Sequence, residues 1–222
     1  MYFQFLAEDE STKVLLHHVM KKLEALYEQK EILWDIKFFK GIGHLTKVGT
    51  PLQQKTGKLL NDLPMYLRAF DKVIQAMGEG AIFIVLDNDK RDICEFQKQL
   101  KNVAINNMIL SDYVFCVAVK EMEAWLLGDI QAIEMAYPRL KKNAYKKYVQ
   151  DDICDTWEVL ADMVYPGGLA KLKKKSAGSY YEIGKVKAEW ADKIGASLDL
   201  KNNMSPSFNY FLSQLKTRVE AA

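Results

Sequence analysis

The sequence has few cysteines, few prolines and little net charge. Among its 222 residues there are three cysteines and five prolines, and the formal net charge is only +2. The cysteines are odd in number, widely spaced and never arranged as CxxC, which excludes a disulfide framework and gives no zinc-binding cluster. A net charge this small does not by itself indicate a protein that binds nucleic acid.

Long apolar runs are also absent. No segment approaches the ~18–20 consecutive apolar residues that a membrane-spanning helix needs. The amino-terminal segment Met1–Phe5 has neither the basic region nor the long apolar stretch of a secretory signal peptide. We therefore expect a cytoplasmic protein with no membrane partner.

The chain has no P-loop for a nucleotide phosphate. That motif reads GxxxxGK[ST]. Gly57-Lys58 is followed by Leu59, and Leu52 stands where the first glycine would be required. Carboxylates elsewhere in the chain therefore do not serve a nucleotide cradle of this kind.

The most informative segment that is present is a short apolar run that ends in acids. Residues 81–86 (AIFIVL) are rich in β-branched and aromatic types without alternation, as in a parallel strand buried on both faces. Asp87-Asn88-Asp89 follows at once. Ligands of open α/β sheets bind outside the carboxyl ends of the strands. Two carboxylates at that place are typical of a site for a hard divalent cation and phosphate oxygens.

Strand-like and helix-like segments alternate through the first part of the chain. The patterns predict strands at 2–6, 32–39, 81–86 and 113–119, helices at 13–29, 59–77 and 93–102, and a loop at 40–58. After Gly128 only amphipathic helical segments follow, at 130–137, 156–164, 168–175, 183–194 and 208–219. We expect an α/β domain over residues 1–128, with a mostly parallel four-stranded sheet flanked by helices, and a helical subdomain packed on it over 129–222.

Acids follow three of the four predicted strands. Glu8 follows the first strand, Asp87 and Asp89 the third, and Glu121 and Glu123 the fourth. The carboxyl ends of parallel strands lie on one edge, so these side chains can converge there. We expect them to bind Mg²⁺ or Mn²⁺ together with substrate phosphate.

A phosphatase of the haloacid dehalogenase type also places DxD after an apolar strand. In that class the motif normally lies on the first strand and continues with Thr or Val, whereas here it follows the third strand and Lys90 comes next. A small-molecule phosphatase is therefore the third hypothesis.

Charge is divided unevenly along the chain. Residues 1–129 carry 16 basic and 18 acidic side chains, whereas 130–222 carry 15 and 11. Lysines in the second part alternate with tyrosines, and such residues can contact a phosphate backbone and stack on bases, although lysines are also common on solvated helices. The candidate nucleic-acid-binding residues are Lys141, Lys142, Lys146, Lys147, Lys173, Lys174 and Lys175.

Two sets of residues resemble known families. Glu8 combined with Asp87-Asn88-Asp89 resembles the TOPRIM domain of topoisomerases, primases and related nucleases. The segment 119–129 (VKEMEAWLLGD) resembles the "RExEAWLLAD" signature of the bacterial family known as domain of unknown function 4276. This second resemblance extends over the chain through Ala7-Glu8, Leu63-Pro64, Leu67-Arg68 and 205–208 (SPSF).

The resemblance implies a TOPRIM-like core with a helical carboxy-terminal part. Members of the family are thought to be metal-dependent nucleases of phage-defence or mobile-element systems, often encoded beside an ATPase. Carried over residue by residue, the catalytic acids would be Glu8, Asp87, Asp89 and Glu123, with Glu121 and Asp92 as neighbours and Glu121 as a further metal ligand. Asp87, Asp89 and one of Glu121 and Glu123 would hold the cations, while Glu8 would act as general acid/base or as a further ligand.

The chain departs from the family pattern after Glu8. Asp9 replaces a glycine, and Ser11-Thr12 stands where the family tends to have Thr-Glu. This departure favours a second hypothesis, in which the protein is a catalytically inactive partner subunit of a defence or regulatory complex. The preferred hypothesis is hydrolysis of nucleic-acid phosphodiesters with Mg²⁺ or Mn²⁺.

Overall fold

The four strands form one parallel sheet. The computed structural model describes residues 1–45, 56–152 and 154–222, so most of the predicted loop at 40–58 lies outside the described residues. The strands are β1 (Tyr2–Ala7), β2 (Leu33–Phe38), β3 (Gly80–Asp87) and β4 (Asp112–Ala118), in the order β2-β1-β3-β4. All three pairings are parallel, and Asp87 lies opposite Ala118. The predicted α/β fold with a four-stranded sheet is confirmed, and the sheet is entirely parallel.

The described helices follow the predicted pattern closely, and α2 and α7 have the predicted bounds. α1 begins at Glu10, three residues earlier than predicted, because the Asp9 carboxylate accepts a hydrogen bond from the Thr12 N–H. The sequence pattern does not predict α4 and α6, because a helix of one turn is too short to show a periodic pattern. The helices are α1 (Glu10–Leu26), α2 (Leu59–Met77), α3 (Ile93–Asn106), α4 (Glu123–Leu127), α5 (Ile130–Ala136), α6 (Lys142–Tyr145), α7 (Thr156–Val164), α8 (Gly168–Ser176), α9 (Tyr180–Ser197) and α10 (Pro206–Ala221).

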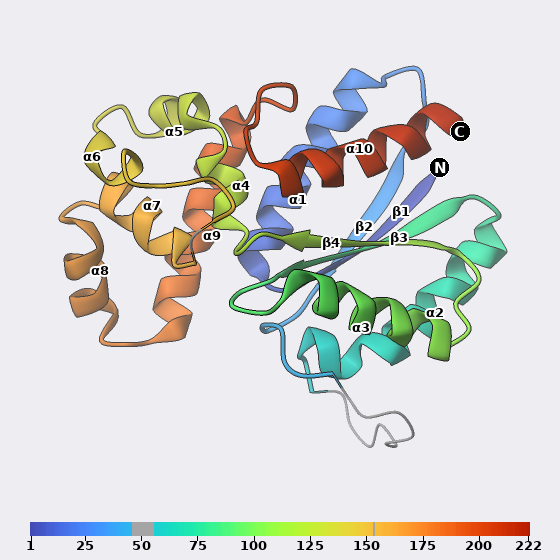
Figure 1. Ribbon diagram of the computed structural model, residues 1–222. Coiled ribbons are helices and arrows are strands. Elements are labelled where there is room, and N and C mark those ends of the chain that lie inside the picture. The colour runs from blue at the N-terminus through green and yellow to red at the C-terminus, as the bar shows by residue number, and fades with distance from the viewer. Residues whose placement is uncertain (46–55, 153) are drawn as a thin grey trace.

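The sheet separates two apolar cores. Side chains alternate along each strand, so Phe5 and Phe83 point to one face whereas Ile82 and Ile84 point to the other. Figure 1 shows α1 and α10 on one face of the sheet and α2 and α3 on the other. This three-layer arrangement explains why β3 is apolar at consecutive positions.

The helices α4 to α9 lie beyond the carboxyl ends of the strands (Figure 1) and together form the helical part of the protein. α9 packs along α1, and a Cβ added to Gly195 would lie 2.9 Å from the His18 ring. α10 then returns and packs against β4. The segment 129–222 therefore contributes both to the helical part and to the cover of the sheet, and the boundary at 128/129 stays a prediction.

The EAWLLGD segment forms the connection between the sheet and the helical part. The Trp125 ring is fully buried and stacks on Phe211 with ring centroids 5.1 Å apart. The side-chain amide of Asn203 donates to the Trp125 carbonyl, and its oxygen accepts from the Ser205 N–H. Gly128 permits this contact, because a Cβ there would lie 2.2 Å from the Asn203 Oδ1. The motif is therefore largely accounted for by packing.

Among the described residues, no helix is both long enough and apolar enough to cross a membrane.

Gly128→Ala should destabilise the fold, because the added methyl group displaces the Asn203 amide from the Trp125 carbonyl and approaches the Ser205 backbone. We expect a loss of about 1–3 kcal/mol in the free energy of unfolding, measured by urea denaturation. Gly184→Ala in α9 is the matched control, since its added Cβ meets nothing within 4 Å. It should be neutral or stabilising by up to about 1 kcal/mol. Equal losses in both variants would contradict the packing account.

Candidate active site at the carboxyl edge of the sheet

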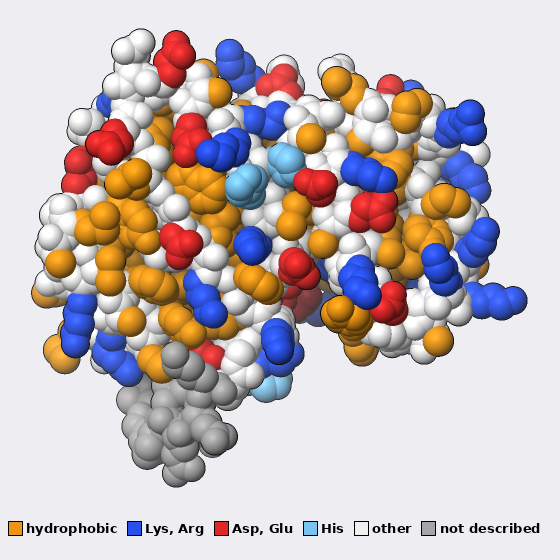
Figure 2. All heavy atoms as spheres, turned by 180° about the vertical axis from the view of Figure 1, so that it is seen from behind, with side chains coloured by type: hydrophobic (Ala, Val, Ile, Leu, Met, Phe, Trp, Pro, Cys, Tyr) orange, Lys and Arg blue, Asp and Glu red, His pale blue; other side chains and the backbone are white. Residues whose placement is uncertain are grey.

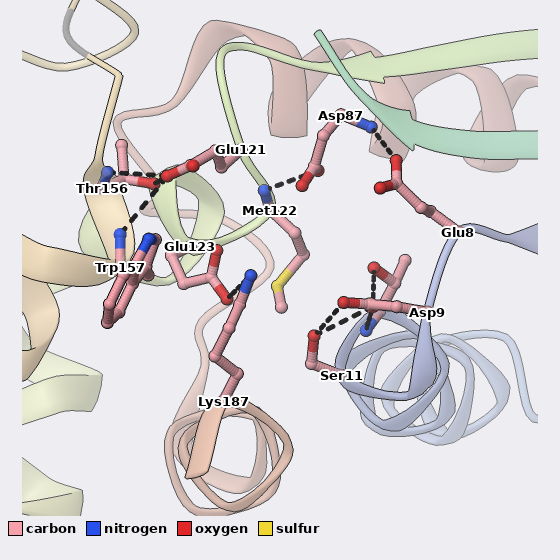
Figure 3. A network of polar contacts seen from close by, with 11 residues as sticks. Glu8, Asp9, Ser11, Asp87, Glu121, Met122, Glu123, Thr156, Trp157 and Lys187 are labelled. Atoms are coloured by element: carbon pink, nitrogen blue, oxygen red, sulfur yellow. Dashed lines mark hydrogen bonds and ion pairs between the residues drawn. The ribbon is translucent and has the colours of Figure 1, made fainter. Parts of the chain in front are cut away.

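Glu8 and Asp87 are joined at the ends of adjacent strands. The Asp87 N–H donates to Glu8 Oε2 at 2.9 Å, and the Met122 N–H donates to Asp87 Oδ1 at 2.8 Å (Figure 3). These bonds fix the orientation of both carboxylates. The other oxygens, Glu8 Oε1 and Asp87 Oδ2, accept no hydrogen bond from any residue that the structure describes. Each carboxylate therefore keeps one oxygen for a ligand.

Glu123 and Lys187 form a buried ion pair beside them. The Glu123 side chain is completely buried at the start of α4, and Lys187 Nζ approaches Glu123 Oε1 to 3.1 Å from α9. This contact is an ion pair without good hydrogen-bond geometry, so within the described part of the chain neither carboxylate oxygen has a hydrogen-bond donor. A fully buried carboxylate with an unpartnered oxygen is costly unless a proton or a cation is also present.

Burial and mutual repulsion disfavour ionisation of the carboxylates. Burial first, and then the charges of Asp9 and Asp89, raise the pKa of Glu8 from 4.5 to about 8. Burial raises the pKa of Glu123 to about 7, with the Lys187 ammonium opposing the shift. Burial and the Glu8 charge raise the pKa of Asp87 well above its ordinary value.

Lys187 is charged in this environment. Burial lowers the pKa of Lys187, but the surrounding carboxylates, Glu123 first among them, raise it more, so the net shift is upward. The candidate site thus combines three acids whose pKa values are raised with one lysine that stays charged.

Glu121 has a different role from Glu123 although it is only two residues away. Its Oε2 accepts from the Thr156 N–H and the Thr156 hydroxyl, both at 2.7 Å, and from the Trp157 N–H at 3.4 Å. It therefore caps the start of α7. Figure 3 shows its side chain directed toward Thr156 and away from Asp87. Glu121 therefore connects α7 to the edge of the sheet. It acts on Glu123 through its negative charge, which raises the pKa of Glu123.

Asp89 lies next to the Glu8–Asp87 pair, with its side chain half exposed. Its Oδ2 accepts from Arg91 Nη1 at 2.7 Å. With Lys90, Glu121, Cys154 and others it lines an open cavity of about 490 Å³. Asp89 is thus placed to meet a ligand in that cavity, and its charge also contributes to the raised pKa of Glu8. Asp92 caps α3 by accepting from the Glu95 N–H at 2.8 Å.

The predicted nucleic-acid-binding lysines all lie on the helical part. They are outside the carboxylate cluster, which consists of Glu8, Asp87 and Glu123. Two are partly neutralised, since Lys142 pairs with Glu134 at 2.5 Å and Lys173 with Glu158 at 3.5 Å. Lys141 and Lys147 line a cavity of about 750 Å³ that shares Cys154 and Asp155 with the cavity beside Asp89. Lys146, Lys174 and Lys175 are exposed and form no ion pair with a described residue.

A complete metal cage is not present. Within residues 1–45, 56–152 and 154–222, no group of three or more His, Cys, Asp or Glu side chains could hold a metal ion as it stands. Mg²⁺ often takes only one or two protein carboxylates and completes its shell with water and substrate phosphate. The free oxygens of Glu8 and Asp87 fit that type of site.

Sequence reasoning missed Lys187. The lysine lies on the side of α9 that also carries Trp190 and Ile194, three and seven residues further on, both of which are buried. A lysine on an apolar helix face needs a buried anion. That signal could have indicated an acidic partner, but not which of the acids it would be.

The stability of the metal-free protein should fall as the pH rises from 5 to 8. The folded-state pKa values of Glu8 and Glu123, about 8 and about 7, lie above the ordinary value of 4.5, so the folded protein holds protons that the unfolded chain releases. This stabilisation is complete below about pH 4.5 and is lost as the pH passes through about 7 to 8. Lys187 does not oppose it, because a lysine with a raised pKa stays charged throughout this window.

Melting temperatures measured in EDTA at several pH values would test this linkage. Glu8→Gln should flatten the pH dependence and should melt above the wild type at pH 8. Glu28→Gln changes an exposed glutamate of the same chain and should leave the profile unaltered. A wild-type melting temperature that rises toward pH 8 would contradict the assignment.

Comparison with known proteins gives one family. The chain matches no curated protein and no solved structure significantly. Residues 7–216 match the family described as a domain of unknown function (DUF4276). The matched residues include Glu8, Asp87, Glu123 and Lys187, and they extend from the end of β1 through the other strands and the helical part into α10. The chain therefore belongs to the family known as domain of unknown function 4276.

Proposed function

We propose that this protein is a metal-dependent phosphodiesterase that hydrolyses nucleic acid. The observation that carries the proposal is the Glu8–Asp87 pair, in which two carboxylates at adjacent strand ends are held by backbone N–H groups and each keep one free oxygen. Burial and neighbouring acids raise both pKa values although the Lys187 charge opposes the shift, and a bound divalent cation would favour the ionised carboxylates. A TOPRIM-like nature of the sheet domain is part of this proposal.

Glu8 Oε1 and Asp87 Oδ2 would hold Mg²⁺ or Mn²⁺, with Asp89 as a further ligand from the adjoining cavity. A cation bound there would supply Lewis-acid activation of the phosphoryl group and of an attacking water. Glu123, whose pKa is about 7, can accept or return a proton near neutral pH. The Lys187 ammonium lies where it can stabilise negative charge that develops on the phosphate.

The lysines of the helical part would supply affinity. Lys146, Lys174 and Lys175 have no acidic partner among the described residues and are free to contact phosphates. A role in phage defence, beside an ATPase partner, also belongs to this proposal and follows from the family resemblance alone.

A second candidate is a catalytically inactive subunit of such a complex. Two observations favour it. Lys187 already gives the carboxylates a positive neighbour without a metal, and Asp9, which replaces the glycine expected from the family, serves as the cap of α1. The two candidates differ in whether the carboxylates bind a divalent cation.

Adding Mn²⁺ or Mg²⁺ should raise the melting temperature of the wild-type protein, because a cation that binds only the folded state stabilises it by mass action. At about 100 times the dissociation constant the gain is about 2.7 kcal/mol. Asp87→Asn should abolish this gain and leave the metal-free protein as stable as the wild type, or more so. Glu28→Gln should keep the gain. A wild-type melting temperature that is indifferent to millimolar metal would favour the inactive subunit.

Wild-type protein should cut DNA or RNA in the presence of Mn²⁺. Glu8→Gln and Asp87→Asn should each lower the single-turnover rate at least about 100-fold, the usual effect of losing a catalytic acid or base. Both variants should retain binding, since the lysines of the helical part are unchanged.

Replacing Lys173, Lys174 and Lys175 by Ala should instead weaken binding whatever the sequence of the nucleic acid. The slope of log affinity against log salt should become shallower by about 0.7–0.9 per lost phosphate contact. The proposal fails if the wild type cuts neither DNA nor RNA in any form, or if Asp87→Asn cuts as fast as the wild type.

A further inference from the structure

One face of α9 runs from the core to the exposed end of the helix. Trp190 and Ile194 on this face are buried, and the helix packs there along α1. Seven residues are nearly two helical turns, so Tyr180 lies on the same side of the helix as Lys187. Tyr180 is 91% exposed. The face that is packed from Lys187 onward therefore continues through the partly buried Ile183 and Gly184 to the exposed Tyr180.

The exposed end of the helix presents aromatic rings and open space. The Tyr180 ring makes no hydrogen bond and no aromatic or cation–π contact with a described residue, and the neighbouring Tyr181 is 70% exposed. Lys185 Nζ lies 4.3 Å from the centre of the Tyr181 ring. Gly184, between Tyr180 and Lys187, leaves a gap, because a Cβ there would meet nothing within 4 Å. Tyr180 therefore presents a free aromatic face, which is the kind of surface on which an unpaired base stacks.

This surface leads to the carboxylate cluster. At about 1.5 Å per residue, Tyr180 lies roughly 10 Å along the helix axis from Lys187, a distance that a few nucleotides span. Lys187 contacts Glu123. Figure 2 shows the molecule hollowed between the sheet part and the helical part, with acidic side chains in the hollow and basic and hydrophobic side chains on the helical side. The neighbouring α8 packs on α9 and carries the exposed Lys173, Lys174 and Lys175.

We propose that the first two turns of α9 bind single-stranded nucleic acid, with one base stacked on Tyr180 and the phosphate chain passing Gly184 toward Lys187. Unpaired bases expose the π-faces that stack on tyrosine, whereas a duplex keeps them inside its own stack. This inference rests on the proposed function and specifies its substrate as a single strand or an unpaired end. It assigns Tyr180 as a binding residue with no part in the chemistry.

Fluorescence anisotropy in EDTA separates binding from cleavage. The probes are labelled oligonucleotides of about 20 nucleotides, as single-stranded DNA, single-stranded RNA and a DNA duplex. Wild-type protein should bind at least one single strand about tenfold or more tighter than the duplex. Tyr180→Leu should weaken single-strand binding about 5- to 150-fold, the range of losing one stacked base, and leave duplex binding unchanged.

Two further variants serve as controls. Tyr180→Phe keeps the ring and should retain single-strand affinity. Tyr210→Leu removes a tyrosine of comparable size that is 47% exposed on α10, and it should bind within about twofold of the wild type. A loss that is equal in Tyr180→Phe and Tyr180→Leu would overturn the stacking role.

The outcomes distinguish this inference from the proposed function. If Tyr180→Leu binds single strands like the wild type, or if the duplex binds equally well, the inference is wrong. Metal-dependent cleavage that is lost in Asp87→Asn would then still support the nuclease. If the wild type binds no nucleic acid, both fail, and the exposed tyrosines are better explained as a contact for a protein partner.

Discussion

The buried pair of Glu123 and Lys187 is the interaction on which the arrangement of this protein depends. Glu123 lies in the segment that leaves β4, and Lys187 lies on α9, whose remaining length packs along α1. Removing Glu123 would leave the Lys187 ammonium without its nearest partner in a largely buried place, which typically costs more than a surface ion pair contributes. The pair therefore links the helical part to the segment that follows β4, and it also supplies the positive charge of the candidate site.

The acids at the sheet edge fall into two groups by what their oxygens do. Asp9, Asp92 and Glu121 accept backbone N–H bonds at the starts of α1, α3 and α7, so they are used as helix caps. Glu8 and Asp87 keep one oxygen each, and Glu123 is unpartnered except for the Lys187 contact. Counting every acid at this edge would overestimate the number of metal ligands, because a carboxylate that caps a helix and a carboxylate that binds a cation are the same chemical group. Hydrogen-bond partners separate the two uses.

The segment that resembles the family signature contains residues of two kinds, some that pack the core and one that belongs to the candidate site. In EAWLLGD, the tryptophan and the glycine belong to the packing of α10 and Asn203, whereas Glu123 belongs to the carboxylate cluster. Packing and site are connected, because α4 both covers the core and places Glu123 beside Lys187. A change in the packing of Trp125 would therefore also move a residue of the candidate site.

Local sequence patterns are sufficient to predict a mostly parallel sheet and most of the helices. The apolar run at 81–86 requires cover on both faces, and alternating strand and helix patterns allow few topologies. The same reasoning brings Glu8 and Asp87 to one edge, because strand ends are fixed by strand direction. The local pattern does not show that Glu121 caps α7 or that Lys187 pairs with Glu123. These partners are 35 and 64 positions apart in the chain, and side-chain orientation at a strand end depends on which helix packs there. Local pattern therefore fixes which element carries an acid, while long-range packing fixes what that acid meets.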